Sequence, residues 1–361
     1  MRKKYRLSRR LQNNSGIILF IVLWALVILT ALALSLGRGT NIELTLAKYS
    51  MAKLKAKYLA WAGLVYAIHQ ISLDSENENS SKQDTLYYCA IPMDAPASAE
   101  SLFKQRPLGD GYFEVAFPQY DTPEDQSSFR FGLADEERKI NINALSTANA
   151  GIFSSLIVVL GFDEESAKTI AFSAVDWVDQ DDNLSQQSYG AEADEYTALG
   201  YHCKNLPFDS LEELLLVKGM TRDVFKKIKN YITIFPKTGG LKINFDTASE
   251  IVLKALAYSS TGGMTQAGIA DADALAEKLV RYRAGEDGIE FTEDDRVIDW
   301  NEAALNIPEK DLYQAMSSFR TNKSNFLHIV ARGRVENLEI DAFLEAVISR
   351  EDLAVVYWKT Y

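Results

Sequence analysis

The chain is poor in the residues and motifs on which most enzymes depend. Among its 361 residues are only three histidines, His69, His202 and His328, and two cysteines. It has no Gly-x-Ser-x-Gly nucleophile motif, no His-Glu-x-x-His zinc motif and no glycine-rich phosphate loop. His202 stands beside Cys203, but two ligands do not make a zinc site. The sequence therefore predicts a protein that is not an enzyme.

Positive charge is also scarce. The 38 Lys and Arg residues stand against 50 Asp and Glu residues, which gives a net charge of −12. The first 16 residues carry six basic side chains and no acidic one, so a chain without them would have a net charge of −18. Such a charge repels nucleic acid and favours cations. The length indicates two or more structural units.

One stretch lacks charge altogether. Ile17 to Leu36 is 20 residues long and has no Asp, Glu, Lys, Arg, Gly or Pro. A helix of this length spans roughly 30 Å, which is enough to cross the hydrocarbon core of a bilayer. The basic residues before it favour a cytoplasmic N-terminus. We therefore expect one pass through the inner membrane, with the bulk of the chain in the periplasm.

The junction between the leader and this stretch is distinctive, because Gly16 is followed directly by the apolar run. It resembles the prepilin processing site of type IV pilins and type II secretion pseudopilins. The resemblance implies that prepilin peptidase cuts between Gly16 and Ile17 and methylates the new N-terminus. A secretory signal peptide removed within Ala31 to Ser35 and a plain signal anchor are the alternatives.

The fifth residue after that junction departs from the pilin pattern. Pilins usually carry a glutamate there, which is thought to meet the N-terminal amine of the neighbouring subunit, and this chain has Ile21. A carboxylate in lipid is costly unless it is paired. A subunit without it can still be the first of a filament, because nothing sits above it.

The segment after the apolar run predicts a continued helix and then strands. Apolar residues recur every three or four positions from Leu44 to Ile68, past a soft point at Gly37–Gly39, and the helix is expected to end near Ser72. Strands are expected at 86–91, 111–117 and 128–133, and a three-strand meander at 326–335, 339–348 and 353–358.

A weak internal repeat lies between the two groups of strands. Lys139–Asn143 (KININ) is echoed by Lys242–Asp246 (KINFD), with an offset of 103 residues. Each copy is followed by a Thr-Ala pair, whose Thr147 or Thr247 is a candidate N-cap, and then by two helices and an acidic loop. A compact helix pair is expected at 211–220 and 224–231. The repeat predicts two related helical units in one domain.

The first acidic loop is the one candidate site. Asp179, Asp181 and Asn183 alternate as in the first half of an EF-hand loop, but Leu184 replaces its glycine, so the loop is not an EF-hand. A second cluster of oxygen ligands follows closely: Glu192, Asp194 and Glu195. Calcium takes six to eight oxygens, so the sequence predicts calcium at this loop. A solvated acidic loop is the alternative, and the loop from Glu286 to Asp295 is a weaker calcium candidate.

The order of elements resembles the K-type minor pseudopilin of type II secretion systems. The resemblance rests on Ile21, the Ile-Asn-x-Asn/Asp segments, the acidic loop and the terminal VVYW strand at 355–358. It implies an α+β pilin-like fold, in which a long helix packs on an antiparallel sheet that carries a large inserted α-helical domain. The boundaries expected are a leader at 1–16, the long helix at 17–72, strands at 73–143, the helical insert at 144–322 and strands at 323–361.

The same resemblance implies partners, a role and calcium at the acidic loop. The partners are the I-type and J-type minor pseudopilins, the major pseudopilin filament and prepilin peptidase, with secreted proteins and the outer-membrane secretin as further candidates. The role is to start pseudopilus assembly at the filament tip and to help export folded proteins.

A membrane-anchored DNA receptor is the competing interpretation. The two Ile-Asn segments and the stretch LLVKGM resemble helix-hairpin-helix domains of competence proteins. Those hairpins hold DNA phosphates with two glycines and basic neighbours, whereas each hairpin here has one glycine, Gly161 or Gly219. The charge of −18 opposes phosphate binding. We therefore expect no nucleic-acid partner.

The two cysteines, Cys89 and Cys203, would lie in an oxidising compartment if the bulk of the chain is periplasmic. A disulfide between them is possible in chemical terms, and spacing alone does not decide it.

Overall fold

The computed structural model describes residues 15–76, 84, 99–118, 129–261 and 266–361. By internal contacts the chain divides into two compact units, Met1–Lys55 and Ala56–Tyr361. Each unit is described by itself below.

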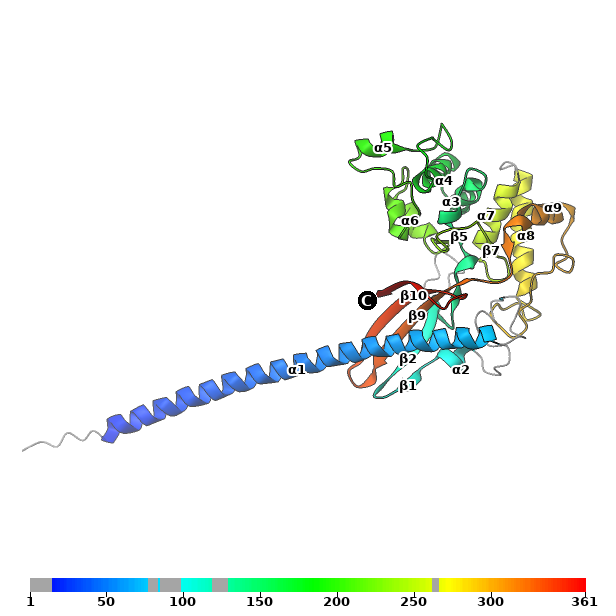
Figure 1. Cartoon of the computed structure of the whole chain (residues 1–361). Coiled ribbons are helices and arrows are strands. Elements are labelled where there is room, and N and C mark those ends of the chain that lie inside the picture. Colours follow the sequence, from blue (N-terminus) through cyan, green and yellow to red (C-terminus); the bar gives the residue numbers. More distant parts are fainter. Residues whose placement is uncertain (1–14, 77–83, 85–98, 119–128, 262–265) are drawn as a thin grey trace, which may run out of the picture. The chain divides into compact units, whose positions relative to one another are not determined.

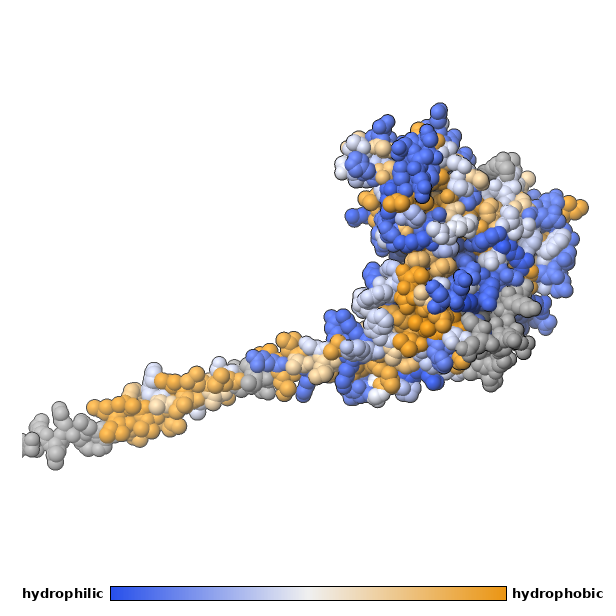
Figure 2. Space-filling view, viewed as in Figure 1, coloured by the Kyte–Doolittle hydropathy of each residue, from blue (hydrophilic) through white to orange (hydrophobic). Residues whose placement is uncertain are grey.

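The first unit contains most of one long helix, α1 (Ser15–Glu76). Its stretch from Gly16 to Leu36 has a mean hydropathy of 3.1 and no buried residue, so it is long and apolar enough to cross a membrane. Figure 2 shows this stretch as a hydrophobic surface. The helix does not break at the predicted soft point, because a glycine costs only about 1 kcal/mol inside a helix that is already propagating. It ends four residues beyond the predicted Ser72.

The second unit is built around an antiparallel sheet with the strand order β1-β2-β9-β10-β11 (Figure 1). Two short strands lie off this path, where β3 pairs with β2 and β4 pairs with β9. The bounds are β1 (Arg106–Leu108), β2 (Gly111–Pro118), β3 (Phe129–Phe131), β4 (Ala134–Asp135), β9 (Phe326–Val335), β10 (Ile340–Ser349) and β11 (Val355–Thr360). The predicted C-terminal meander and the strand at 111–117 are confirmed. The strand expected at 128–133 is only three residues long, and the one expected at 86–91 lies outside the described residues.

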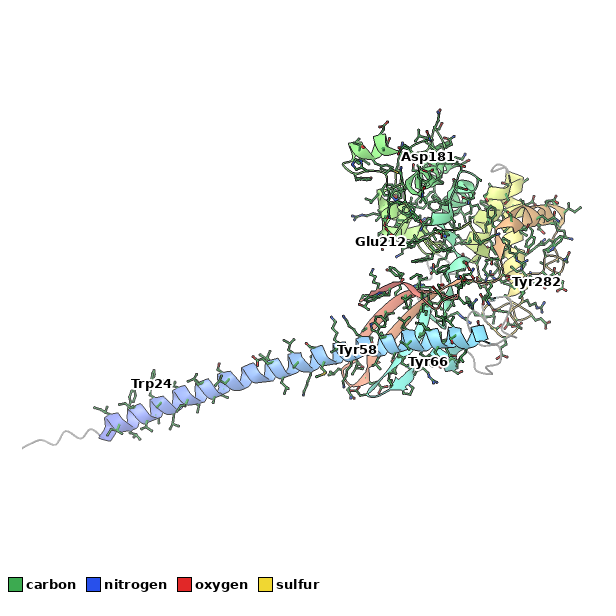
Figure 3. The ribbon with its side chains drawn as sticks, in the orientation of Figure 1. Trp24, Tyr58, Tyr66, Asp181, Glu212 and Tyr282 are labelled. Carbon is green, nitrogen blue, oxygen red and sulfur yellow. The ribbon has the colours of Figure 1, made fainter. Side chains whose placement is uncertain are left out.

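The last turns of α1 pack on one face of this sheet. Alternate residues of β9 and β10 face the helix and form a core with it: Ala60, Leu64, Ala67, Ile71, Leu327, Ile329, Ala331, Leu344, Ala346 and Ile348. A short helix, α2 (Ala99–Phe103), adds Phe103, whose ring lies 6.0 Å from that of Tyr66 (Figure 3). The pilin-like arrangement of helix on antiparallel sheet is therefore confirmed.

The opposite face of the sheet contacts a block of helices, which Figure 1 shows on the far side of the sheet from α1. Val347 of β10 belongs to the core of this block, and Phe326 and Tyr357 pack against that core. The block consists of two modules, which we call the first module (139–237) and the second module (242–321).

The elements of the first module are β5 (Ile140–Asn141), the 3-10 turn Ile142–Ala144, α3 (Ala150–Val159), α4 (Glu164–Val178), α5 (Ala193–Ala198), the 3-10 turn Leu211–Leu216, α6 (Arg222–Ile228) and β6 (Ile232–Thr233). Those of the second are β7 (Ile243–Asn244), α7 (Glu250–Ser260), α8 (Gln266–Arg283), α9 (Ile307–Met316), the 3-10 turn Ser317–Phe319 and β8 (Arg320–Thr321). Two further 3-10 turns, Glu136–Arg138 and Glu336–Leu338, lie outside the modules.

The two modules close in the same way. The first strand of each pairs in parallel with its last strand, so that Ile140 faces Ile232 and Ile243 faces Arg320. Helices α3 and α7 lie against each other, and both modules share one apolar core. The KININ and KINFD segments thus hold equivalent places at the start of their modules.

The asparagines of the repeat are structural. Asn141 Oδ1 accepts the Asn143 amide (2.9 Å), and Asn244 Oδ1 accepts the Asp246 amide (3.1 Å). The second polar residue of each segment holds a distant loop of its own module. The Asn143 side-chain oxygen accepts the backbone amide of Phe208 (2.7 Å), and the Asp246 carboxylate accepts the backbone amide of Ile298 (2.6 Å). Buried polar groups are retained when such bonds satisfy them.

The two predicted N-caps are wrong. Helix α3 has Asn149 at its N-cap position, and α7 is capped by Ser249, whose hydroxyl accepts the Val252 amide at 3.3 Å. Thr247 instead donates to Asp135 (2.7 Å). In both modules the helix begins two residues later than the Thr-Ala pair suggested. The first helix of the predicted pair at 211–220 is a 3-10 turn, stabilised by a capping box between Ser210 and Glu213.

We predict that Gly333→Ala destabilises the fold by about 1–3 kcal/mol, the usual cost of overpacking. A Cβ at Gly333 of β9 would lie 2.1 Å from the Ala56 carbonyl oxygen and 2.4 Å from the Ala60 amide nitrogen. Gly151→Ala is the matched control, because its nearest neighbour would be 4.0 Å away. Chemical unfolding of the full chain in detergent micelles measures both. Equal stabilities of the two variants would contradict this close contact.

Candidate functional site

The acidic loop begins where α4 ends and folds back on that helix. The fold depends on Asp176, a fully buried carboxylate near the end of α4. Its two oxygens accept the backbone amides of Ser185 (2.8 Å) and Ala191 (2.7 Å), one on each arm of the loop. Only glycine fits at Gly190, where a Cβ would lie 2.3 Å from the Asp176 carboxylate.

This closure brings Asp179 and Glu192 together. Both oxygens of Glu192 and one oxygen of Asp179 are buried and have no well-aligned hydrogen bond from a described residue, although the weak thiol donor of Cys203 interacts with Glu192. Glu192 is only 7% exposed. The carbonyl-type oxygen of Asn205, a residue in the left-handed conformation at φ 47°, is buried and unbonded in the same way.

The electrostatics follow from that burial. Desolvation, with the charges of Asp176 and Asp179 next, raises the pKa of Glu192 to about 7. Desolvation, with Asp176 and Asp181 next, raises the pKa of Asp179 to about 6. Unpaired buried carboxylates are costly, and a cation between them would offset that cost. The donor set, all oxygen, suits calcium.

The other predicted ligands are engaged elsewhere or lie at the surface. Asp181 Oδ1 accepts both the amide (2.8 Å) and the side-chain nitrogen (2.9 Å) of Asn183, and both residues are exposed (Figure 3 labels Asp181). Glu195 pairs with Lys218 at 3.4 Å, and Asp194 is exposed in the first turn of α5. Within the described ranges, no three His, Cys, Asp or Glu side chains already form a metal centre. Sequence reasoning missed Asp176, which stands one helical turn before Asp179, and Asn205, for which no local signal exists.

Cys203 lies beside this cluster. Its thiol donates to the Asp176 carbonyl oxygen at 3.4 Å, and burial raises its pKa to about 12. It is a free cysteine with respect to the part of the chain that is described. Cys89, the other member of the possible disulfide, lies outside that part.

The second acidic loop has an internal cation instead. Arg283, at the end of α8 and 2% exposed, donates to Glu290 from Nε (2.9 Å) and Nη2 (2.6 Å). Its third nitrogen donates to the carbonyls of Phe245 (3.0 Å) and Ala248. Asp294 accepts from Thr292 and from the amides of Asp287 and Glu286, which lowers its pKa to about 2. Most of the loop's carboxylates are therefore satisfied by internal donors, although Asp295 Oδ1 is buried without a described partner and burial raises the pKa of Asp295 to about 6.

The helix hairpin formed by α3 and α4 around Gly161 is poorly suited to bind DNA phosphates. The N-terminus of α4, which follows Gly161, is capped by Asp163, whose carboxylate accepts the Ser166 amide at 2.8 Å. Lys227 donates to the Leu160 carbonyl at 3.2 Å and so holds the hairpin within the molecule. A carboxylate at the helix terminus opposes the binding of an anion there.

The proposed processing residues lie in the first unit. Gly16 has no neighbour within 4 Å of an added Cβ, Ile17 is 62% exposed, and Ile21 is 59% exposed. The side chains of Ile17 and Ile21 are therefore accessible to lipid or to another helix.

Comparisons with known proteins agree with one another. A family model described as type II secretion system (T2SS), protein K, matches residues 138–237, which is the first module. An Escherichia coli K12 protein described as type II secretion system protein K is 25% identical over 76% of this chain and 77% of its own length. The protein of that name from Pectobacterium carotovorum is 26% identical over 44% of this chain and about half, 51%, of its own length.

A protein K from Dickeya chrysanthemi is 32% identical over 27% of this chain and 26% of its own length. Among solved structures, a chain in the GspK-GspI-GspJ complex of the type 2 secretion system of enterotoxigenic Escherichia coli is similar in fold. The TM-score is 0.61 at 19% identity, over 88% of this chain and 99% of that one.

Proposed function

We propose that the chain belongs to the type II secretion system protein K family, whose members are minor pseudopilins, and that it starts pseudopilus assembly at the filament tip and thereby helps to export folded proteins. The observation that carries this proposal is the fold likeness, which includes both the helix on its sheet and the helical block. The function is structural, with the bulk of the chain on the periplasmic side of the inner membrane.

The place at the tip is supported by two features of the chain. Ile21 supplies no carboxylate to hold the amine of a subunit above it. The helical block lies on the sheet face that α1 leaves open, and its bulk would hinder stacking of a further subunit. The solved relative forms a complex with GspI and GspJ, so the I-type and J-type minor pseudopilins are the proposed partners.

The acidic loop of the first module is the proposed calcium site. Asp179 and Glu192 would hold the ion, with Asn205 adding its side-chain oxygen and Asp176 positioning both arms of the loop. Calcium supplies charge neutralisation, so that the buried carboxylates remain ionised. The exposed Asp194 and the ion-paired Glu195 are the least suited of the predicted ligands.

We predict that calcium raises the unfolding temperature of the full chain, because it binds the folded state. At a calcium concentration of 100 times Kd the gain is about 2.7 kcal/mol. Asp179→Asn and Glu192→Gln should remove most of this gain, whereas Glu195→Gln, which changes an exposed and ion-paired side chain, should keep it. Thermal unfolding in calcium and in chelator measures the effect. A calcium response that disappears in Glu195→Gln but persists in Glu192→Gln would contradict the assignment.

We predict that the mature chain begins at N-methylated Ile17, since Gly16 lies at the end of the basic leader. Mass spectrometry of the N-terminal peptide, from protein extracted from the native membrane, tests this. Gly16→Leu should leave the chain starting at Met1. A native chain that begins near Ser35, or one that still begins at Met1, would contradict the processing proposal.

We predict that the chain co-purifies with both other minor pseudopilins of its system. The Ile21→Glu variant should assemble poorly, because its buried carboxylate has no amine partner at the tip. Ile21→Leu is the control and should behave as the natural chain. Cross-links distributed along the filament shaft, or purification without either partner, would rule out the tip position.

A further inference from the structure

The helical block is an insertion, so the chain enters and leaves it through two connections. The entering connection runs from β4 through the 3-10 turn Glu136–Arg138, and the leaving one runs from β8 to β9. These connections lie side by side, because the Asn325 amide donates to Glu137 Oε2 at 2.6 Å. Any loosening here would change how firmly the block is held on the sheet.

Buried carboxylates gather at this junction. Asp74 of α1, Asp84, Asp135 and Glu137 are each between 1% and 6% exposed, and Arg350, itself 6% exposed, is buried with them. Arg350 binds Asp84 through two nitrogens, at 2.7 Å and 3.1 Å, and lies 3.5 Å from Asp74. The guanidinium therefore contacts two of the four buried acids, Asp84 and Asp74, and Asp135 and Glu137 have no such partner among the described residues.

Neutral donors connect Asp84 with Asp135, the Asn325 amide next to Ser324 extends the network to Glu137, and Arg350 links Asp74 to it. Asn244 of the second module donates to Asp135 (2.9 Å) and to the Asp84 carbonyl (3.2 Å). The Ser324 amide donates to Asp84 at 2.7 Å, and the Thr247 hydroxyl donates to Asp135 at 2.7 Å. Asp74 Oδ1 is buried and accepts no hydrogen bond from a described residue.

We propose that this cluster is a proton-sensitive junction, which holds the two connections of the helical block firmly when it carries a proton and loosens them when it is fully ionised. The reason is electrostatic, since four ionised acids exceed the charges of the Arg350 guanidinium and the Lys323 ammonium and leave an excess of negative charge. A shared proton removes part of that excess.

The charged groups around Glu137 determine the pH range in which the junction gains or loses its proton. On the cluster side it faces Asp135, with Asp84, Asp74, Arg350 and Lys323 beyond it. On the other side the neighbouring Glu136 is balanced by Lys139 and His328. Burial, with the charge of Asp135 next, raises the pKa of Glu137 to about 7. Burial also raises the pKa of Asp135 and of Asp74.

The sign of the effect follows from linkage. The pKa of Glu137 is higher when the junction is closed than when it is open and the carboxyl is exposed to water. Protonation of Glu137 therefore stabilises the closed junction fully below the pKa of the exposed carboxyl, and this stabilisation is lost as the pH rises through 7. Opening of the junction should therefore become about tenfold more frequent between pH 6 and pH 8.

The test is hydrogen exchange of the full chain in detergent micelles with a chelator present, expressed as protection factors that correct for the intrinsic pH dependence. Protection of the Ser324 and Asn325 amides should fall about tenfold from pH 6 to pH 8, while amides in the middle of β10 keep theirs. Glu137→Gln should abolish this fall, and Glu351→Gln, an exposed carboxyl on the turn after β10, should not.

Asp135→Asn gives a second variant in case Glu137→Gln does not fold. It removes the neighbouring charge, so the fall in protection should shift to lower pH. The chelator keeps the acidic loop of the first module in one state, and Glu192→Gln should leave the junction profile unchanged. A natural chain with constant protection across this range, or a Glu137→Gln variant that keeps the fall, would overturn the proposal.

Discussion

Strand β9 is covered on both faces, fully buried toward α1 and half-buried on the other, and the rest of the second unit depends on this. Its residues alternate between two cores, with Leu327, Ile329 and Ala331 toward α1 and Phe326 toward the helical block. Because successive side chains point to opposite faces, a shift of one residue would exchange the two sets. The strand also carries Gly333, where the backbone of α1 approaches too closely for any side chain. One strand thus fixes both the pilin-like layer and the position of the helical block.

The two modules of that block show how a duplicated unit can satisfy the same need by different means. Each has a loop rich in acids after its second helix, and each loop contains buried carboxylate oxygens. In the second module the Arg283 guanidinium pairs with Glu290 and two backbone carbonyls. In the first module no described cation pairs with Glu192. This difference is the physical reason to propose an ion for the first loop in preference to the second, where only Asp295 Oδ1 is left without a described partner.

Much of this could be predicted from the sequence, because periodicity and turn residues carry the signal. The apolar span, the strand at 111–117, the C-terminal meander and the paired Ile-Asn segments are all local patterns. The predictions failed where a distant partner decides the outcome. Thr247 is a plausible cap by its neighbours, but Asp135 takes its hydroxyl. Asp181 alternates as a ligand would, but it caps its own turn at Asn183. The contributions of Asn205 and of the Asp84–Arg350 pair depend on contacts between residues far apart in the chain, and no pattern in the sequence reveals them.

The proposed calcium site would link the fold to the function, since an ion that fixed the first loop would also fix the module that the family model matches. The number of calcium ions bound per chain tests it most directly. Titration calorimetry of the chelator-treated full chain should give one site, which disappears in the Asp179→Asn and Glu192→Gln double variant. A stoichiometry of two would show that Arg283 does not replace the ion in the second loop. A stoichiometry of zero would contradict the account of the first.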